Sequence, residues 1–278
     1  MNDIRLAAVQ MTSGDDVAVN LTAARQQLQA AARHGARLAV LPENFAFMSA
    51  SESARARIAE ADGNGPIQDF LAGAAREFGL WIVGGTIPIR SAEAERPYAS
   101  CCVWDGQGRR VGRYDKMHLF DVRVPDSSEA YRESARTMPG NTPLTLATPF
   151  GALGIAVCYD LRFPELFRAM LELEVSVIAL PAAFTQRTGQ AHWHTLLKAR
   201  AIENLAYVVA AAQGGEHPGG RRTYGHSLIA GPWGEVLAEA GTGPGVVTAT
   251  LDADYLRRLR AQFPVLSHRR LATGAAAG

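Results

Sequence analysis

A cysteine stands where an apolar run of the sequence gives way to a charged one. The stretch Gly154–Val157 leads into Cys158, and Tyr-Asp-Leu-Arg-Phe-Pro-Glu follows. A strand that ends in a sharp turn before a helix exposes its last side chain at the carboxyl edge of a sheet, where open α/β folds bind ligands. Helix N-terminal amides and nearby cations lower the pKa of a thiol and favour thiolate. We therefore predict a nucleophile at Cys158, with a buried structural cysteine as the alternative. Cys101 and Cys102 lie mid-strand and are expected to be structural.

Three further charged residues stand where a fold could bring them to this thiol. Glu43 ends the apolar run Leu38–Pro42, where partial burial raises the pKa of a carboxyl group toward the range of a general base. Lys116 is one of only two lysines against 26 arginines, and an ammonium beside the thiol would favour thiolate and stabilise an oxyanion. Glu133 could orient Lys116 or a substrate amine. For all three, an ordinary solvated side chain is the alternative interpretation.

Apolar periodicity predicts alternating strands and helices that would carry these residues. The expected strands cover residues 4–11, 37–41, 80–87, 98–104, 109–114, 153–157, 175–180, 207–212, 227–230, 235–239 and 246–251. The expected helices cover residues 16–34, 66–78, a segment near 164, 192–204 and 252–262. Residues 115–149 contain four prolines and little periodicity, so we expect a long loop there. Strands that alternate with helices predict a mostly parallel sheet with added hairpins, in one domain built from two similar halves.

Length and composition narrow the class of protein. The chain has 278 residues and a net charge of +1, which argues against a nucleic-acid-binding protein with a broad basic face. Hydrophobic residues make up 47% and charged residues 20%, as in ordered globular proteins. We expect neither a membrane span nor secretion, because no apolar run of about 18 residues and no basic leader occurs. Three cysteines cannot build a disulfide framework, which favours a cytoplasmic location.

Three stretches of the sequence resemble the nitrilase, or carbon–nitrogen hydrolase, superfamily. They are Leu-Pro-Glu at 41–43, Tyr-Asp-Lys-Met-His-Leu at 114–119 and Cys-Tyr-Asp-Leu-Arg-Phe-Pro-Glu at 158–165. The resemblance implies an α/β fold, a four-layer α-β-β-α sandwich with two mixed sheets. It implies a single domain over residues 1–270, followed by a flexible tail at 271–278. It makes Glu43 the general base, Lys116 the oxyanion stabiliser and Cys158 the nucleophile, and it implies neither a metal nor an organic cofactor.

Within the superfamily, the sequence looks most like the amidases that hydrolyse deaminated glutathione. Thr-Met-Pro-Gly at 137–140, Thr-Gly-Gln-Ala-His-Trp at 188–193 and Tyr-Gly-His-Ser at 224–227 carry this likeness. The implied reaction cleaves a small carboxylate-bearing amide to acid and amine through a cysteine thioester. Omega-amidases, which release ammonia from α-ketoglutaramate or α-ketosuccinamate, are the alternative. The resemblance also implies a homodimer or homotetramer, with no nucleic-acid or membrane partner.

Four residues are expected to contact the substrate: Tyr159, Arg162, Phe184 and Thr188. The last three match positions that line the pocket of the resembling amidases, and a backbone N–H near Tyr159 would help to hold the oxyanion. Arg162 could bind a carboxylate through two hydrogen bonds, with a salt bridge to Asp160 or Glu165 as the alternative.

Three other interpretations of these residues compete with this one. A papain-like hydrolase would use His118 as the partner of Cys158, but the sequence around papain-type nucleophiles is absent. A metal site on His192 and His194 is not expected, because side chains two apart face different sides of a helix. A catalytically silent scaffold that binds partners through its surface would have no need of Glu43, Lys116 and Cys158 together.

Overall fold

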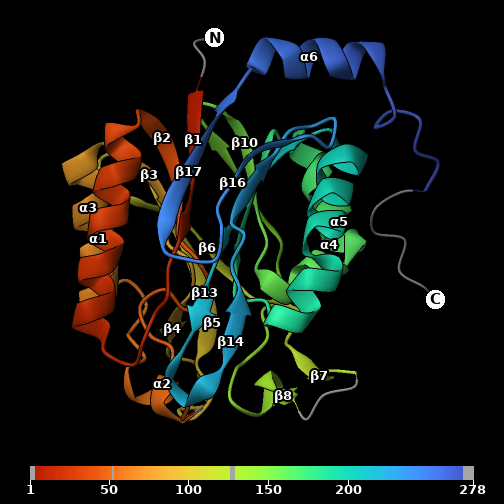
Figure 1. Cartoon of the computed structure of the whole chain (residues 1–278). Coiled ribbons are helices and arrows are strands. Elements are labelled where there is room, and N and C mark those ends of the chain that lie inside the picture. The colour runs from red at the N-terminus through yellow and green to blue at the C-terminus, as the bar shows by residue number, and fades with distance from the viewer. Residues whose placement is uncertain (1–3, 52, 126–128, 272–278) are drawn as a thin grey trace.

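Two β-sheets are stacked between outer layers of helices in the computed structural model, which describes residues 4–51, 53–125 and 129–271 (Figure 1). The first part of the chain runs through β1 (Ile4–Gln10), α1 (Val17–Arg33), β2 (Ala36–Val40), α2 (Ala54–Arg57), α3 (Pro66–Phe78), β3 (Trp81–Val83), β4 (Ile87–Ile89), β5 (Tyr98–Trp104) and β6 (Arg110–Asp115). The middle part contains β7 (Asp121–Arg123), β8 (Ala130–Arg132), the 3-10 helix η1 (Glu133–Ala135), β9 (Leu144–Thr148), β10 (Gly151–Ile155), the 3-10 helix η2 (Cys158–Arg162), α4 (Pro164–Ala169), η3 (Met170–Leu173) and β11 (Val177–Ala182). The last part contains α5 (Gln186–Asn204), β12 (Tyr207–Ala212), β13 (Gly214–Glu216), η4 (Pro218–Gly220), β14 (Arg222–Tyr224), β15 (Leu228–Ala230), β16 (Val236–Glu239), β17 (Gly245–Leu251) and α6 (Ala253–Gln262).

Both sheets mix parallel and antiparallel pairs. The first has the order β17-β1-β2-β3-β5-β4, with β6 beside β5, and the second has the order β16-β15-β12-β11-β10-β9. The neighbours β1, β2 and β3 are parallel, as are β10, β11 and β12. Helices α1 and α3 cover the outer face of the first sheet, and α4 and α5 cover that of the second (Figure 1). The four-layer α-β-β-α sandwich implied by the family resemblance is confirmed.

The alternation of side chains along β1 explains the layering. Leu6 and Ala8 belong to the apolar core between the two sheets, whereas Ala7 and Val9 pack on the side of α1 and α3. All four side chains are fully buried. A strand with both faces covered is expected to be a nearly continuous apolar run, as Leu6–Val9 of β1 is.

The helix boundaries follow the capping residues of the sequence. The Asp16 carboxylate accepts a hydrogen bond from the Val19 N–H at 3.1 Å, so α1 begins directly after it. Pro66 begins α3, and Gly79, in the left-handed conformation at φ 64°, ends it. In the described part of the chain, none of the helices combines the length and the apolar character needed to cross a membrane.

Several predicted boundaries were wrong. The expected strand at residues 80–87 is divided into β3 and β4, because the chain turns at Gly85, which adopts φ +57°. Only glycine fits at this turn, because a Cβ there would lie 2.2 Å from the Pro42 carbonyl oxygen. The expected loop at 115–149 contains β7, β8, η1 and β9, and β9 pairs with β10 at the edge of the second sheet. Helix α5 begins at Gln186 rather than at His192, and the hairpin β13–β14 was not predicted. Most of the expected tail, residues 272–278, lies outside the described residues.

Candidate active site

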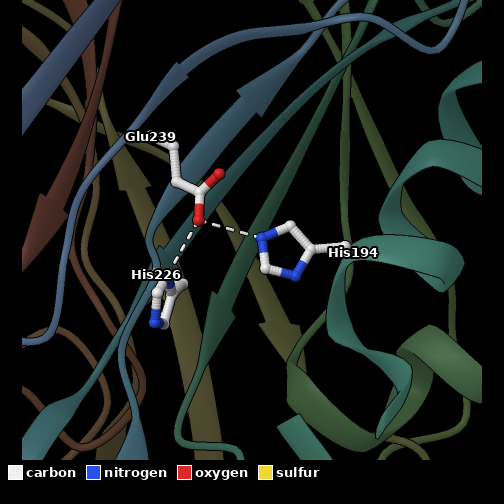
Figure 2. A group of neighbouring side chains, drawn as sticks. All are labelled: His194, His226 and Glu239. Atoms are coloured by element: carbon white, nitrogen blue, oxygen red, sulfur yellow. Dashed lines mark hydrogen bonds and ion pairs between the residues drawn. The ribbon is translucent and has the colours of Figure 1, made fainter. Parts of the chain in front are cut away.

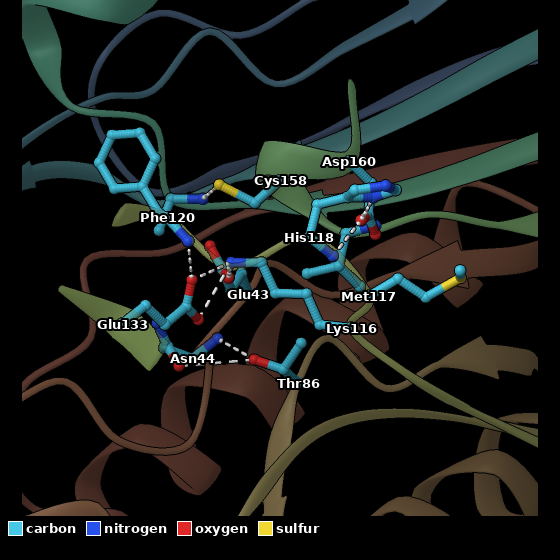
Figure 3. Close-up of polar contacts among 12 residues, drawn as sticks. Glu43, Asn44, Thr86, Lys116, Met117, His118, Phe120, Glu133, Cys158 and Asp160 are labelled. Atoms are coloured by element: carbon cyan, nitrogen blue, oxygen red, sulfur yellow. Dashed lines mark hydrogen bonds and ion pairs between the residues drawn. The ribbon is translucent and has the colours of Figure 1, made fainter. Parts of the chain in front are cut away.

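The ends of three strands place Glu43, Lys116 and Cys158 at one edge of the two facing sheets. Glu43 stands three residues after β2, Lys116 directly follows β6, and Cys158 stands three residues after β10. Figure 3 shows the three side chains converging there, with Glu133 approaching from the segment after β8. The structure therefore brings together all four residues that were proposed for the chemistry.

Lys116 lies between two carboxylates. Its Nζ donates to Glu43 Oε1 at 2.8 Å and to both oxygens of Glu133, at 2.8 and 3.1 Å. Lys116 is 1% exposed and Glu43 is 4% exposed. A buried ammonium in this position is fixed in place and retains its charge, because both of its partners are anionic.

Glu133 is held in turn by the backbone. Its Oε2 accepts a hydrogen bond from the Phe120 N–H at 2.7 Å while it contacts Lys116. The segment directly after β8, expected to be part of a loop without regular structure, thus delivers a fixed carboxylate to the buried lysine. Sequence reasoning found Glu133 but could not show which of its suggested partners it contacts.

The backbone at Cys158 is held in an unusual conformation. Cys158 has φ +49°, a region that costs a residue with a Cβ about 1–2 kcal/mol. Ala183 directly follows β11, and its N–H donates a hydrogen bond to the Cys158 sulfur at 3.5 Å. The sharp turn predicted after the strand is present, but a single 3-10 helix, η2, begins at Cys158, and α4 starts only at Pro164.

The buried Asp160 carboxylate stabilises this turn through hydrogen bonds. It is fully buried, and its Oδ2 accepts hydrogen bonds from the Val157 N–H at 2.8 Å and the Tyr114 hydroxyl at 2.7 Å. Its Oδ1 accepts a hydrogen bond from the His118 N–H at 3.1 Å and lies 2.7 Å from His118 Nδ1. His118 is therefore a partner of Asp160, stacked on Phe163, and the papain-like alternative loses its histidine.

The protonation states differ from those expected from the sequence. Burial and the neighbouring Glu43 carboxylate raise the pKa of the Cys158 thiol well above its usual value, against the lowering effect of Lys116. Burial alone would raise the pKa of Glu43, but the charge and hydrogen bond of Lys116 and a hydrogen bond from Cys158 bring it below its usual value. The pair therefore rests as a neutral thiol and a carboxylate. Both predicted pKa directions were wrong, because each considered one of the opposing effects alone.

A pocket opens over the sulfur. Its lining includes Glu43, Lys116, Glu133 and Cys158, together with all four residues predicted to contact the substrate. Arg162 stacks over the rings of Tyr159 and Phe184, at 5.8 and 5.2 Å from their centroids. Its Nη1 lies 3.2 Å from His192 Nδ1, and no ion pair joins it to Asp160 or Glu165 in the described residues.

Sequence reasoning missed most of the positive charge in this pocket. Five arginines line it: Arg55, Arg132, Arg136, Arg162 and Arg221. None of them forms an ion pair with a carboxylate of the described residues, whereas both glutamates of the pocket are paired with Lys116. Of the five, only Arg162 was predicted to bind the substrate, because the others are spread over three distant stretches of an arginine-rich chain.

A second cluster of titratable groups lies outside the pocket lining. His194 of α5 does not join His192 but meets His226 and Glu239, the last residue of β16 (Figure 2). His194 Nε2 and His226 Nδ1 lie 2.9 and 2.8 Å from the same oxygen of Glu239. These contacts connect α5, β16 and the segment after β14.

Comparisons with known proteins agree with this arrangement. Residues 5–261 match the carbon–nitrogen hydrolase family. The chain belongs to the carbon–nitrogen hydrolase family. It is 43% identical to the deaminated glutathione amidase of Synechocystis over 266 residues, which cover 95% of this chain and 97% of that protein. As a carbon–nitrogen hydrolase it is an enzyme of the amidase type.

Solved structures share the fold of this carbon–nitrogen hydrolase. The NitFhit protein of Caenorhabditis elegans has a TM-score of 0.90 and 35% identity, over 97% of this chain and 66% of that one. The amidase from Nesterenkonia sp. AN1 has a TM-score of 0.77 and 29% identity, over 94% of this chain and 98% of that one. In one variant of that amidase, acrylamide has added to the active site cysteine.

Proposed function

We propose that this carbon–nitrogen hydrolase cleaves the amide bond of deaminated glutathione, releasing α-ketoglutarate and cysteinylglycine. The observation that carries this proposal is the neutral thiol of Cys158 beside the buried Glu43 carboxylate, in a pocket whose five arginines form no ion pair with any carboxylate of the described residues. The name of the Synechocystis relative supports this choice of substrate.

Acylation uses Glu43 as the base. Glu43 accepts the proton of Cys158 as the sulfur attacks the amide carbonyl carbon, and Lys116 and a backbone N–H near Tyr159 hold the resulting oxyanion. One preorganised oxyanion donor contributes roughly 3–4 kcal/mol to lowering the barrier. When the tetrahedral intermediate collapses, the carbon–nitrogen bond breaks and Glu43 gives its proton to the departing amine.

Deacylation reuses the same groups. Glu43, again a carboxylate, removes a proton from a water molecule that attacks the thioester carbonyl. The carbon–sulfur bond then breaks, and the proton on Glu43 returns to Cys158. Glu133 contacts neither reacting atom. Its role is to keep the Lys116 ammonium in place when Glu43 becomes neutral.

The charge of the pocket favours a substrate with more than one carboxylate. Deaminated glutathione carries one carboxylate on its α-keto acid and another on its glycine, whereas α-ketoglutaramate carries only the first. Five arginines that lack an acidic partner in the described part of the chain are more than a single carboxylate can use, because one guanidinium already binds a carboxylate through two hydrogen bonds. This favours deaminated glutathione over the omega-amidase substrates.

We also propose a homo-oligomer in a reducing, cytoplasmic compartment. Exposed apolar side chains support the first proposal: Ile202, Trp233 and Phe263 are 44, 54 and 44% exposed. Cys101, Cys102 and Cys158 are all free thiols, which fits a reducing location.

The test is a comparison of kcat/KM for deaminated glutathione and α-ketoglutaramate with the purified protein. Release of cysteinylglycine is followed for the first substrate and release of ammonia for the second. We expect at least a tenfold higher kcat/KM for deaminated glutathione. A preference for α-ketoglutaramate would make the chain an omega-amidase, and hydrolysis of neither substrate would overturn the proposal.

A further inference from the structure

Two of the pocket arginines contact opposite ends of a row of aromatic rings. The rings of Tyr131 and Phe120 lie 5.1 Å apart between centroids, as do those of Phe120 and Tyr159. Arg221 stacks over Tyr131 at 5.3 Å, and Arg162 stacks over Tyr159 at 5.8 Å. All five side chains line the pocket. The row therefore separates two guanidinium groups along the pocket wall.

Arg221 is also close to the nucleophile. Its Nη2 donates to the Ala183 carbonyl at 3.2 Å, and the N–H of the same residue contacts the Cys158 sulfur at 3.5 Å. These two distances and the span of the Ala183 residue between them place the guanidinium within about 10 Å of the Cys158 sulfur. Its positive charge lowers the pKa of Glu43, which also places it near the reacting groups.

The hydrogen-bonding capacity of Arg221 is largely unused. A guanidinium has five N–H donors, and the Ala183 carbonyl takes one of them. The buried Nε has no partner in the described residues. No carboxylate of the described residues lies within ion-pair distance either. A partly buried guanidinium left without an anion at a pocket wall is suited to an anion brought by a ligand.

We propose that Arg221 binds the glycine carboxylate of the leaving cysteinylglycine, while Arg162 takes the α-keto carboxylate of the acyl part. This inference rests on the proposed function and adds a specificity-determining residue to it. The lengths agree. The two residues of cysteinylglycine extend about 7 Å beyond the scissile bond, which is within reach of a guanidinium about 10 Å or less from the sulfur.

The assignment also gives the enzyme a means of discrimination. A substrate that loses the glycine carboxylate leaves Arg221 unpaired in the bound complex, and α-ketoglutaramate has no such group. A charge-assisted contact of this kind changes kcat/KM by roughly 10- to 100-fold. Arg162 serves both substrates equally, since both carry the α-keto carboxylate.

The test compares Arg221→Gln with the wild type on three substrates: deaminated glutathione, its glycine carboxamide and α-ketoglutaramate. For the wild type we expect kcat/KM to fall roughly 10- to 100-fold from the free acid to the carboxamide. For Arg221→Gln we expect the acid and the carboxamide to be hydrolysed with equal kcat/KM. Relative to the wild type, kcat/KM for deaminated glutathione should fall, mainly because KM rises. Arg222→Gln is the matched control, because Arg222 is exposed and absent from the pocket lining, and it should retain the wild-type discrimination.

The outcomes separate this inference from the proposed function. If the wild type prefers deaminated glutathione but Arg221→Gln still distinguishes acid from carboxamide, the Arg221 assignment is wrong and the function stands. Loss of the discrimination in Arg55→Gln or Arg136→Gln instead would also overturn it. If Arg221→Gln lowers kcat/KM equally for all three substrates, the arginine acts on Glu43 alone and the inference is again wrong. A wild type without activity on deaminated glutathione would overturn the function itself.

Discussion

Glu133 contacts Lys116 through both of its oxygens, at 2.8 and 3.1 Å, while Lys116 donates to Glu43 at 2.8 Å. The lysine is thus held from two sides by acids that stand 90 residues apart in the sequence. Of the two, Glu133 is also anchored by the Phe120 N–H. The contact between Glu133 and Lys116 does not take part in the proton transfers assigned to Glu43.

We expect Glu133→Gln to lower kcat roughly 100-fold, as the loss of a well-placed oxyanion donor does. The ammonium of Lys116 then loses its second anionic partner and its fixed direction. Because Glu133 is not expected to bind the substrate, KM should change little. Steady-state kinetics on deaminated glutathione provide the measurement. An unchanged kcat, in a variant that keeps the wild-type Tm, would show that Glu133 has no positioning role.

The buried charge of Lys116 should matter for folding as well as for catalysis. Lys116→Met leaves the buried carboxylate of Glu43 and the partly buried carboxylate of Glu133 without a cation, which costs roughly 3–5 kcal/mol in the free energy of unfolding. Urea denaturation measures this loss. Lys198→Met is the control, because Lys198 is the only other lysine and is exposed. Equal stabilities for the two variants would contradict the ion pairs described.

Asp160 positions the nucleophile without touching the substrate pocket. Both of its oxygens accept hydrogen bonds. In Asp160→Asn one of these oxygens is replaced by an NH2 group, which then faces an N–H or O–H donor instead of accepting its hydrogen bond. We expect a loss of roughly 1–3 kcal/mol in the free energy of unfolding, together with a lower kcat, because the turn that bears Cys158 is released. Urea unfolding and kcat are measured on the same sample. A variant that unfolds like the wild type would show that these hydrogen bonds contribute little.

The protonation state of the thiol predicts how it responds to pH. The pKa of Cys158 is raised well above its usual value of 9.0, so the reactive thiolate is scarce at neutral pH. The rate of alkylation by iodoacetamide, followed by mass spectrometry of the peptide that contains Cys158, should rise with pH up to at least pH 9. A plateau near pH 7 would contradict this.

Glu43→Gln should move alkylation and hydrolysis in opposite directions. Removing the carboxylate charge lowers the pKa of the Cys158 thiol, because that charge is one of the causes of its rise. Alkylation at pH 8 should therefore become faster while amide hydrolysis is lost. If alkylation slows instead, the Glu43 charge does not hold the thiol neutral.

The sequence predicted where each reactive residue stands, because strand ends can be recognised from local patterns. Glu43 and Cys158 each follow an apolar strand, Lys116 follows the second strand of the β5–β6 hairpin, and those strands meet at one edge. The directions of the pKa shifts could not be predicted, since they depend on how burial competes with a partner that is distant in sequence.

Contacts between distant segments were missed for the same reason. Asp160 follows Cys158 closely in the sequence, but its partners Tyr114 and His118 come from another strand end. Arg221 follows two glycines in a connection without periodicity, so nothing local placed it in the pocket. The strand β9 escaped recognition because none of its residues is fully buried and its pairing with β10 decides its structure.

In the proposed mechanism, the Cys158 sulfur forms a covalent bond to the carbonyl carbon as the amide bond breaks. The most direct measurement is the rate at which Cys158→Ala releases cysteinylglycine from deaminated glutathione, beside the wild type. We predict that release falls to the uncatalysed background while the variant stays folded. Release at more than about 1% of the wild-type rate, well above the residual activity left when a catalytic nucleophile is removed, would contradict a covalent mechanism at this residue.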